Sequence, residues 1–178
     1  MKRIHRIGLA GLLLAMLLTS AVVFRTPSTV LAAPVQRGFM GQIWNAPLVP
    51  PVELLRPFRA PLTVYGAGHR GVDYLTTDGM VALAPGSGTI SFSGLVALKP
   101  VVAIQHLGGL KTAMEPVCGV LPLGTPVFAG QVVGAVCGKG YVSHCLPALC
   151  LHFSLRNASG YLSPELLFGD LSPSRVIA

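Results

Sequence analysis

Charged residues are scarce in this chain of 178 residues: they make up 11% of it, and only six are Asp or Glu. The sequence has no internal repeat, no heptad pattern, no basic patch interleaved with aromatic residues and no glycine-rich phosphate-binding motif. These absences argue against binding of nucleic acid and of nucleotides. The formal net charge of +7 is mostly N-terminal, because residues 1–32 hold four of the 13 Lys and Arg and no acidic residue, and without them the charge is +3.

The N-terminal region has the build of an export signal. Lys2, Arg3 and Arg6 precede an uncharged apolar run at residues 7–24, and small residues follow up to position 33. This pattern predicts a signal peptide over residues 1–32 and a secreted or cell-envelope protein. The run is also near the shortest length that spans a bilayer, so an uncleaved anchor stays open as the chain's one contact with a membrane.

The remaining chain is long enough for a single domain with one core. Residues 33–55 are rich in proline and show no steady period, which predicts a linker. We place the domain at residues 56–170 and a tail at residues 171–178. Within the domain, closely spaced glycines separate short β-rich segments, for example residues 89–93, 101–104 and 132–136. This spacing predicts an all-β, mostly antiparallel domain, closed by a short helix that runs from Ser163 to Phe168.

Two candidate metal ligands, His69 and Asp73, lie four positions apart on a glycine-flanked segment. On a straight strand they would be about 13 Å apart, too far to share one metal ion. Gly71 predicts a bend that brings the imidazole and the carboxylate together, and zinc accepts both ligand types. His152, in an alternating apolar segment, is the candidate third ligand. Two imidazoles and one carboxylate leave a position for water, which is typical of catalytic zinc sites.

The spacing alone also allows a simpler interpretation. A lone histidine near a turn is commonly a hydrogen-bonded surface residue, and an aspartate beside glycines commonly stabilises the turn. Longer motifs favour the metal site. The His69-x-x-x-Asp73 segment and the late Leu-His152-Phe segment resemble the LytM/lysostaphin family of zinc metallopeptidases, which cut peptide cross-links in peptidoglycan. Residues 78–90 and 124–134 are similar to two further strand segments of that family.

The resemblance covers roughly residues 55–168 and implies a small antiparallel β domain of the LytM/lysostaphin type, related to the duplicated hybrid motif. It also implies Zn²⁺ held by His69, Asp73 and His152, and peptidoglycan peptides as the substrate. Family members usually carry two assisting histidines, and this sequence has Pro116 and Cys150 at those positions.

Two other side chains could replace the assisting histidines. His144, eight residues before His152, could act as a donor, and Glu115 is the nearest carboxylate that could act as a base, although a solvated turn residue is the simpler interpretation of Glu115. An actinobacterial subset of the family is similar in its Glu-Pro-Val and His-Cys…Cys-Leu-His arrangements, which here begin at Glu115 and His144.

Four cysteines permit three pairings, of which we favour Cys145 with Cys150 and Cys118 with Cys137. A disulfide would use up the Cys150 thiol, and the alternative is a free Cys150 that binds zinc or acts as a nucleophile.

Two functions follow from these expectations. The first is a zinc metalloendopeptidase that cleaves cross-links or stem peptides of peptidoglycan. The second is a catalytically degenerate LytM-like domain that binds the cell wall or regulates another murein hydrolase. A lipoprotein-like surface protein is a weaker third possibility, because no cysteine lies near residue 33 to carry a lipid.

Overall fold

The computed structural model describes residues 41–140 and 142–168. The leader expected at residues 1–32 and the tail expected at residues 171–178 lie outside these ranges. Within them, no helix is both long enough and apolar enough to cross a membrane.

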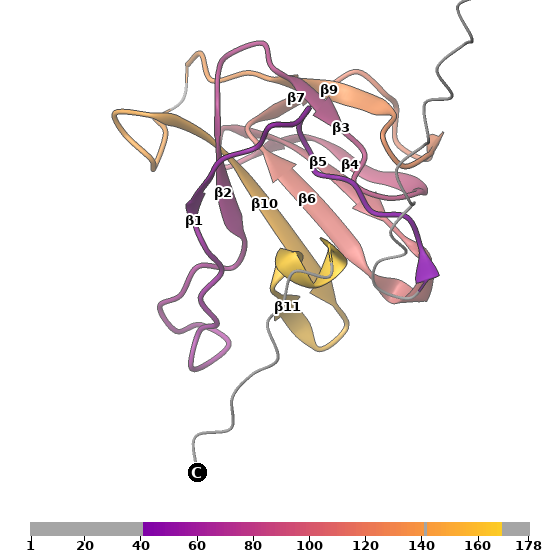
Figure 1. Cartoon of the computed structure of the whole chain (residues 1–178), viewed down its shortest axis with the longest axis horizontal. Helices are drawn as coiled ribbons and strands as arrows, with labels where there is room; N and C mark the ends of the chain where they lie inside the picture. The colour runs from indigo at the N-terminus through magenta and orange to yellow at the C-terminus, as the bar shows by residue number, and fades with distance from the viewer. Residues whose placement is uncertain (1–40, 141, 169–178) are drawn as a thin grey trace, which may run out of the picture. The chain divides into compact units, whose positions relative to one another are not determined.

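Antiparallel strands make up nearly all of the regular structure, which confirms the predicted all-β class (Figure 1). The strands are β1 (Leu54–Arg56), β2 (Val72–Thr76), β3 (Val81–Leu83), β4 (Gly88–Val96), β5 (Lys99–Gln105), β6 (Lys111–Glu115), β7 (Val117–Gly119), β8 (Pro126–Val127), β9 (Val132–Val136), β10 (Leu149–Asn157) and β11 (Gly160–Leu162). Among the elements that lie wholly within the described residues are also the short 3-10 helices η2 (Leu107–Gly109) and η3 (Pro164–Phe168).

The strands form two sheets. The larger sheet has the order β1-β2-β10-β6-β5-β4-β8, with β11 paired to β10 as its eighth strand, and the smaller has the order β3-β9-β7. Figure 1 shows β10 and β6 side by side in the middle of the larger sheet. Because β10 pairs with both β2 and β6, segments that are far apart in the sequence meet around this strand.

The alternation that predicted a strand around His152 describes β10 well. Leu151, Phe153 and Leu155 are fully buried, whereas His152 and Ser154 are partly exposed on the opposite face. Side chains of a strand alternate between faces, so the apolar set joins the core and His152 points away from it. Each large apolar side chain that is buried in this way contributes about 1.5–3 kcal/mol.

The described part of the segment expected as a linker packs on the domain. Trp44 and Leu48 are buried members of the core, and Leu48 forms an isolated bridge with Ala82. The Trp44 ring lies over Gly86, where an added Cβ would come within 2.7 Å of the indole. Residues 41–55 therefore contribute core contacts to the domain that they precede.

The closing helix is present as the single 3-10 turn η3, with Pro164 and Leu167 buried. The predicted cap differs in detail, because the Ser163 hydroxyl donates to the Glu165 carboxylate at 3.0 Å.

Both disulfides that we favoured are formed, Cys118–Cys137 and Cys145–Cys150, and the described residues include no free cysteine. A free Cys150 thiol is thereby excluded as a zinc ligand or a nucleophile.

Candidate metal centre

Strands β2 and β10 bring two of the expected ligands together. Asp73 of β2 and His152 of β10 are direct partners in the antiparallel register. His69 lies just before β2, and the chain bends at residues 70–71, so its side chain turns back toward Asp73. The predicted bend thus overcomes the separation that a straight strand would impose.

The donor atoms of these three residues converge on one point. Asp73 Oδ1 lies 2.8 Å from His152 Nδ1 and 3.2 Å from His69 Nε2, and the two imidazole nitrogens are 3.2 Å apart. Ligand atoms that each lie about 2.0–2.2 Å from one metal ion have separations of this size. The chemistry of the donor set, two imidazole nitrogens and one carboxylate oxygen, therefore fits a divalent metal ion.

The orientation of His69 is fixed from outside the cluster. Its Nδ1 lies 2.7 Å from the Pro57 carbonyl oxygen, which can only accept a hydrogen bond. Nδ1 therefore carries the proton, and the lone pair of Nε2 faces Asp73. A backbone carbonyl that holds the far nitrogen of a metal-binding histidine is a common supporting contact in metal sites.

Asp73 is fully buried, yet it is held ionised. Burial raises its pKa, but hydrogen bonds from His152 and His144, together with the charges of these two residues, outweigh burial and lower the pKa to about 2. Buried carboxylates are uncommon unless they are paired or bind a metal, so this residue identifies the centre of the site.

His144 joins the cluster from the opposite side of the carboxylate. Its Nε2 lies 3.0 Å from Asp73 Oδ2, whereas His69 and His152 face Oδ1. All four side chains offer donor atoms within 4.8 Å of one another. The His144 ring is 5.9 Å from that of His152, farther than the 5.0 Å between the rings of His69 and His152. His144 is therefore beside the three expected ligands and within reach of any group bound to them.

Two contacts hold the loop at His144 and directly after it. The Cys145–Cys150 disulfide closes the chain directly after it, and the Cys150 sulfur lies 3.7 Å from His144 Nε2. The Arg56 guanidinium donates to the His144 carbonyl oxygen at 3.1 Å.

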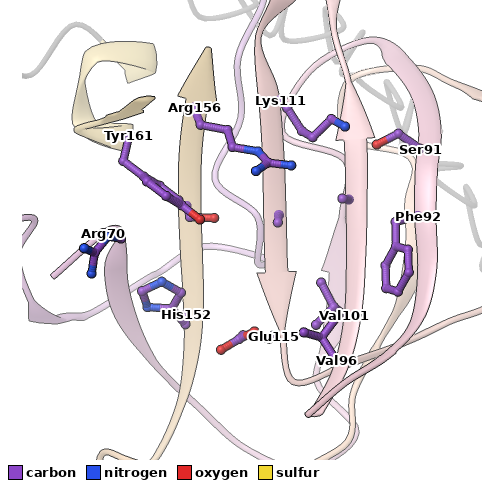
Figure 2. A pocket seen from close by; sticks show the side chains of 13 residues that line it. Arg70, Ser91, Phe92, Val96, Val101, Lys111, Glu115, His152, Arg156 and Tyr161 are labelled. Carbon is purple, nitrogen blue, oxygen red and sulfur yellow. The ribbon is translucent and has the colours of Figure 1, made fainter. Parts of the chain in front are cut away.

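Glu115 lies outside the cluster. It is the register partner of His152 on β6, and its carboxylate accepts a hydrogen bond from Lys99 at 3.2 Å. Glu115 and His152 line one end of a groove of about 580 Å³ on the exposed face of the larger sheet (Figure 2). Its carboxylate is thus charge-paired and close to the cluster, and its catalytic role stays a prediction.

The structure shows contacts around the site that the sequence analysis did not predict. Nothing in the sequence marks the Pro57 carbonyl or Arg56, because backbone acceptors and distant guanidinium contacts leave no local pattern. Arg70, the next residue after His69, donates to the carbonyl oxygens of Val64 and Gly66 and so stabilises the loop before His69.

Known proteins resemble part of the chain. Proteins of Mycobacterium tuberculosis and Mycobacterium bovis, both named only as uncharacterized, are 43% identical to it over 107 residues. The match covers 60% of this chain and 42% of each relative, so it spans less than half the length of these relatives.

Solved structures share the fold. The catalytic domain of the antimicrobial peptidase lysostaphin from Staphylococcus simulans has a TM-score of 0.53 at 23% identity, covering 64% of this chain and 89% of that domain. A mutant catalytic domain of the prophage-encoded M23 protein EnpA from Enterococcus faecalis has a TM-score of 0.53 at 22% identity, covering 65% and 90%. The family model of Peptidase family M23 matches residues 67–164, which include His69, Asp73, His144 and His152. With more than half of its length in that match and the fold in agreement, the chain belongs to peptidase family M23.

Proposed function

We propose that the protein is a zinc metalloendopeptidase that cleaves peptide bonds in peptidoglycan, with zinc held by His69, Asp73 and His152. The observation that carries the proposal is the convergence of two imidazole nitrogens on one oxygen of a buried carboxylate. This donor set suits zinc, and a three-residue set leaves room for water and substrate, as in catalytic zinc sites.

A zinc ion, when bound, supplies Lewis acidity that polarises a peptide carbonyl and lowers the pKa of water. His144 then manages protons. The Asp73 carboxylate can only accept a hydrogen bond, so His144 Nε2 carries the proton. The free Nδ1 of the neutral ring is then the atom that can accept a proton from the attacking water and later donate it to the departing amine. Asp73 Oδ2 holds that ring in place at 3.0 Å.

Glu115 is the second candidate for proton transfer and has a less favourable environment. Its carboxylate is paired with Lys99, and this ion pair occupies one of the two carboxylate oxygens. We therefore assign proton transfer to His144 and expect Glu115 to contribute at the edge of the groove.

The substrate class follows from the family and the compartment. Two disulfides are typical of proteins that reach an oxidising environment, and the lysostaphin domain is described as an antimicrobial peptidase. An extracytoplasmic peptidase with an open groove can reach the peptides of the cell wall, whereas cytoplasmic proteins are out of its reach.

A degenerate domain that binds the wall or regulates another murein hydrolase is the second candidate. It is favoured by Pro116 and Cys150, which stand where the family has assisting histidines. Neither can transfer a proton, because proline has no side-chain donor and Cys150 is disulfide-bonded.

The test is digestion of purified peptidoglycan by the zinc-loaded chain, with and without a chelator, beside Asp73→Ala. The peptidase predicts release of new amino groups that stops with the chelator and in the variant. Wall binding that persists without release in any preparation would support the degenerate domain. Ser159→Ala, a change at the turn between β10 and β11, is a control that should behave like the native chain.

A further inference from the structure

The groove beside the metal centre has a floor of small side chains. Ser154 of β10, Ala113 of β6 and Ala103 of β5 form one row of register partners across three strands. All three line the groove, and their small size gives it depth between the larger residues on either side. The row leaves space for a peptide that lies over the sheet.

The end of the groove away from His152 is basic. Arg156 and Lys111 are direct register partners on β10 and β6, and both line the groove. Figure 2 shows the Arg156 guanidinium lying over β6 toward Lys111, with the Tyr161 side chain beside it. Tyr161 is the partner of Arg156 on β11. Two cations and a phenol therefore share one end.

This pair of cations is unfavourable on its own. Like charges directly opposite each other across a strand pair destabilise a sheet. Among the described residues, the ion pairs involve Asp73, Asp78 and Glu115, and none includes Arg156 or Lys111. An anion placed between the two side chains would remove the repulsion, and guanidinium groups bind carboxylates with paired hydrogen bonds.

The spacing relates the basic end to the metal centre. His152 and Arg156 are four residues apart on one face of β10, which corresponds to about 13 Å. Glu115 and Lys111 have the same separation on β6, so the acidic and basic ends face each other along the groove. An extended peptide covers that length with about four residues.

We propose that Arg156 and Lys111 form a subsite for a free carboxylate of the peptide substrate, about four residues from the bond over the metal centre. The inference rests on the proposed peptidase function and specifies its substrate as an anionic peptide. Tyr161 adds a hydroxyl donor at the same place. Peptides whose carboxylate is amidated lose the ionic contact and bind more weakly.

The test compares synthetic stem tetrapeptides with free or amidated carboxylates. Binding to the zinc-loaded full chain is measured by fluorescence anisotropy, and peptidoglycan cleavage is measured in parallel by release of amino groups. We expect the free form to bind about ten- to a hundredfold more tightly, the usual effect of a charge-assisted contact. Arg156→Gln, Lys111→Gln and the double variant should reduce that ratio stepwise toward one.

Lys139→Gln is the matched control, because it removes the same charge from an exposed side chain that pairs with Asp78 outside the groove. It should keep the native ratio. Removing one of two opposed cations should not lower the free energy of unfolding, so urea unfolding separates a lost subsite from a misfolded variant.

A double variant that still prefers the free carboxylate as strongly as the native chain overturns the subsite. The subsite is also overturned if inorganic phosphate displaces the free and the amidated peptide equally and the two peptides bind with the same affinity. If the native chain cleaves peptidoglycan but binds the free and the amidated peptide equally well, the subsite is rejected and the peptidase function is not. If it prefers the free peptide but does not cleave peptidoglycan, the peptidase function is rejected and the subsite is not.

Discussion

His144 contacts Oδ2 of Asp73, the carboxylate oxygen that His69 and His152 do not face. This position helps to decide whether His144 is a fourth metal ligand or a proton donor beside the metal. A fourth ligand would close the coordination shell, as in structural zinc sites, whereas a neighbouring donor would leave it open. Because His69 and His152 share Oδ1 and His144 faces Oδ2, the geometry favours a donor outside the shell.

His144→Ala should therefore lower kcat on peptidoglycan by about 10²- to 10³-fold, the usual cost of losing one positioned donor, while zinc is retained. Zinc content by mass spectrometry after gel filtration, measured beside kcat, checks both parts. Asp73→Ala should lose the metal as well as the activity. If zinc is lost from the His144 variant to the same extent, His144 is a ligand and our assignment of proton transfer is wrong.

Position 71 has no room for a side chain beside β10 and the His152 ring. Its backbone is not in the left-handed region, but an added Cβ would collide with the Phe153 carbonyl oxygen and would lie 2.6 Å from His152 Nε2. We expect Gly71→Ala to destabilise the fold by about 1–3 kcal/mol and to weaken zinc binding, because the His152 ring must move. Urea unfolding and zinc titration measure the two effects.

Gly94→Ala is the control for Gly71. Its backbone is likewise outside the left-handed region, and the added Cβ would meet only the Phe92 ring at ordinary contact distance, 3.4 Å. This control should bind zinc as the native chain does. Equal zinc affinity in both alanine variants would show that the site tolerates the collision.

At the scale of elements, the two disulfides serve different parts of the fold. Cys118–Cys137 joins β7 to the chain just after β9, at the smaller sheet, whereas Cys145–Cys150 closes the segment between His144 and the start of β10. In the chain-entropy description, the loop of separation 19 contributes about 3 kcal/mol of stability and the loop of separation 5 about 2 kcal/mol.

Replacing each cysteine pair by serine should give two variants that rank in one order for stability and in the opposite order for kcat. The Cys118→Ser, Cys137→Ser variant should lose more stability but keep kcat. The Cys145→Ser, Cys150→Ser variant should lose less stability but lower kcat about tenfold or more, because the His144 loop gains freedom. Thermal unfolding and peptidoglycan digestion of the same preparations compare them. Unchanged kcat in the second variant would mean that Arg56 alone holds the loop.

The elements also show what the sequence can reveal. Alternating apolar residues predicted the strand of His152 and its face, and Gly71 predicted the bend beside Asp73, because both signals are local. Pairing is not local: nothing in the sequence marks His152 as the partner of both Asp73 and Glu115, or Arg156 as the partner of Lys111. The family resemblance nevertheless pointed to the three residues that the structure brings together, and their role as metal ligands stays a prediction, whereas the Pro57 contact and the basic end of the groove needed the structure.

For the molecule as a whole, His106 joins segments that are distant along the chain. Its Nδ1 donates to the Ser87 carbonyl oxygen at 2.9 Å, its Nε2 accepts from the Thr112 hydroxyl at 2.7 Å, and its ring packs edge-on against Trp44 at 4.9 Å. The two hydrogen bonds use one nitrogen as donor and the other as acceptor, so they fit the neutral imidazole. Protonation would require the Thr112 hydroxyl to turn from donor to acceptor and would place a charge in the core.

Burial lowers the pKa of His106 below its ordinary value of 6.5, and the Ser87 hydrogen bond offsets this only in part. Because the folded chain binds this proton less readily than the unfolded chain, stability is fully present above pH 6.5 and is lost as pH falls from there toward the folded pKa. We expect the urea midpoint of the metal-free chain to fall more steeply between pH 7.5 and 5 than that of His106→Gln, whose amide can donate and accept without titrating. A chelator in both samples keeps zinc release from contributing, and the other histidines titrate alike in both chains. Parallel midpoint curves would mean that His106 is not the group that couples acid to unfolding.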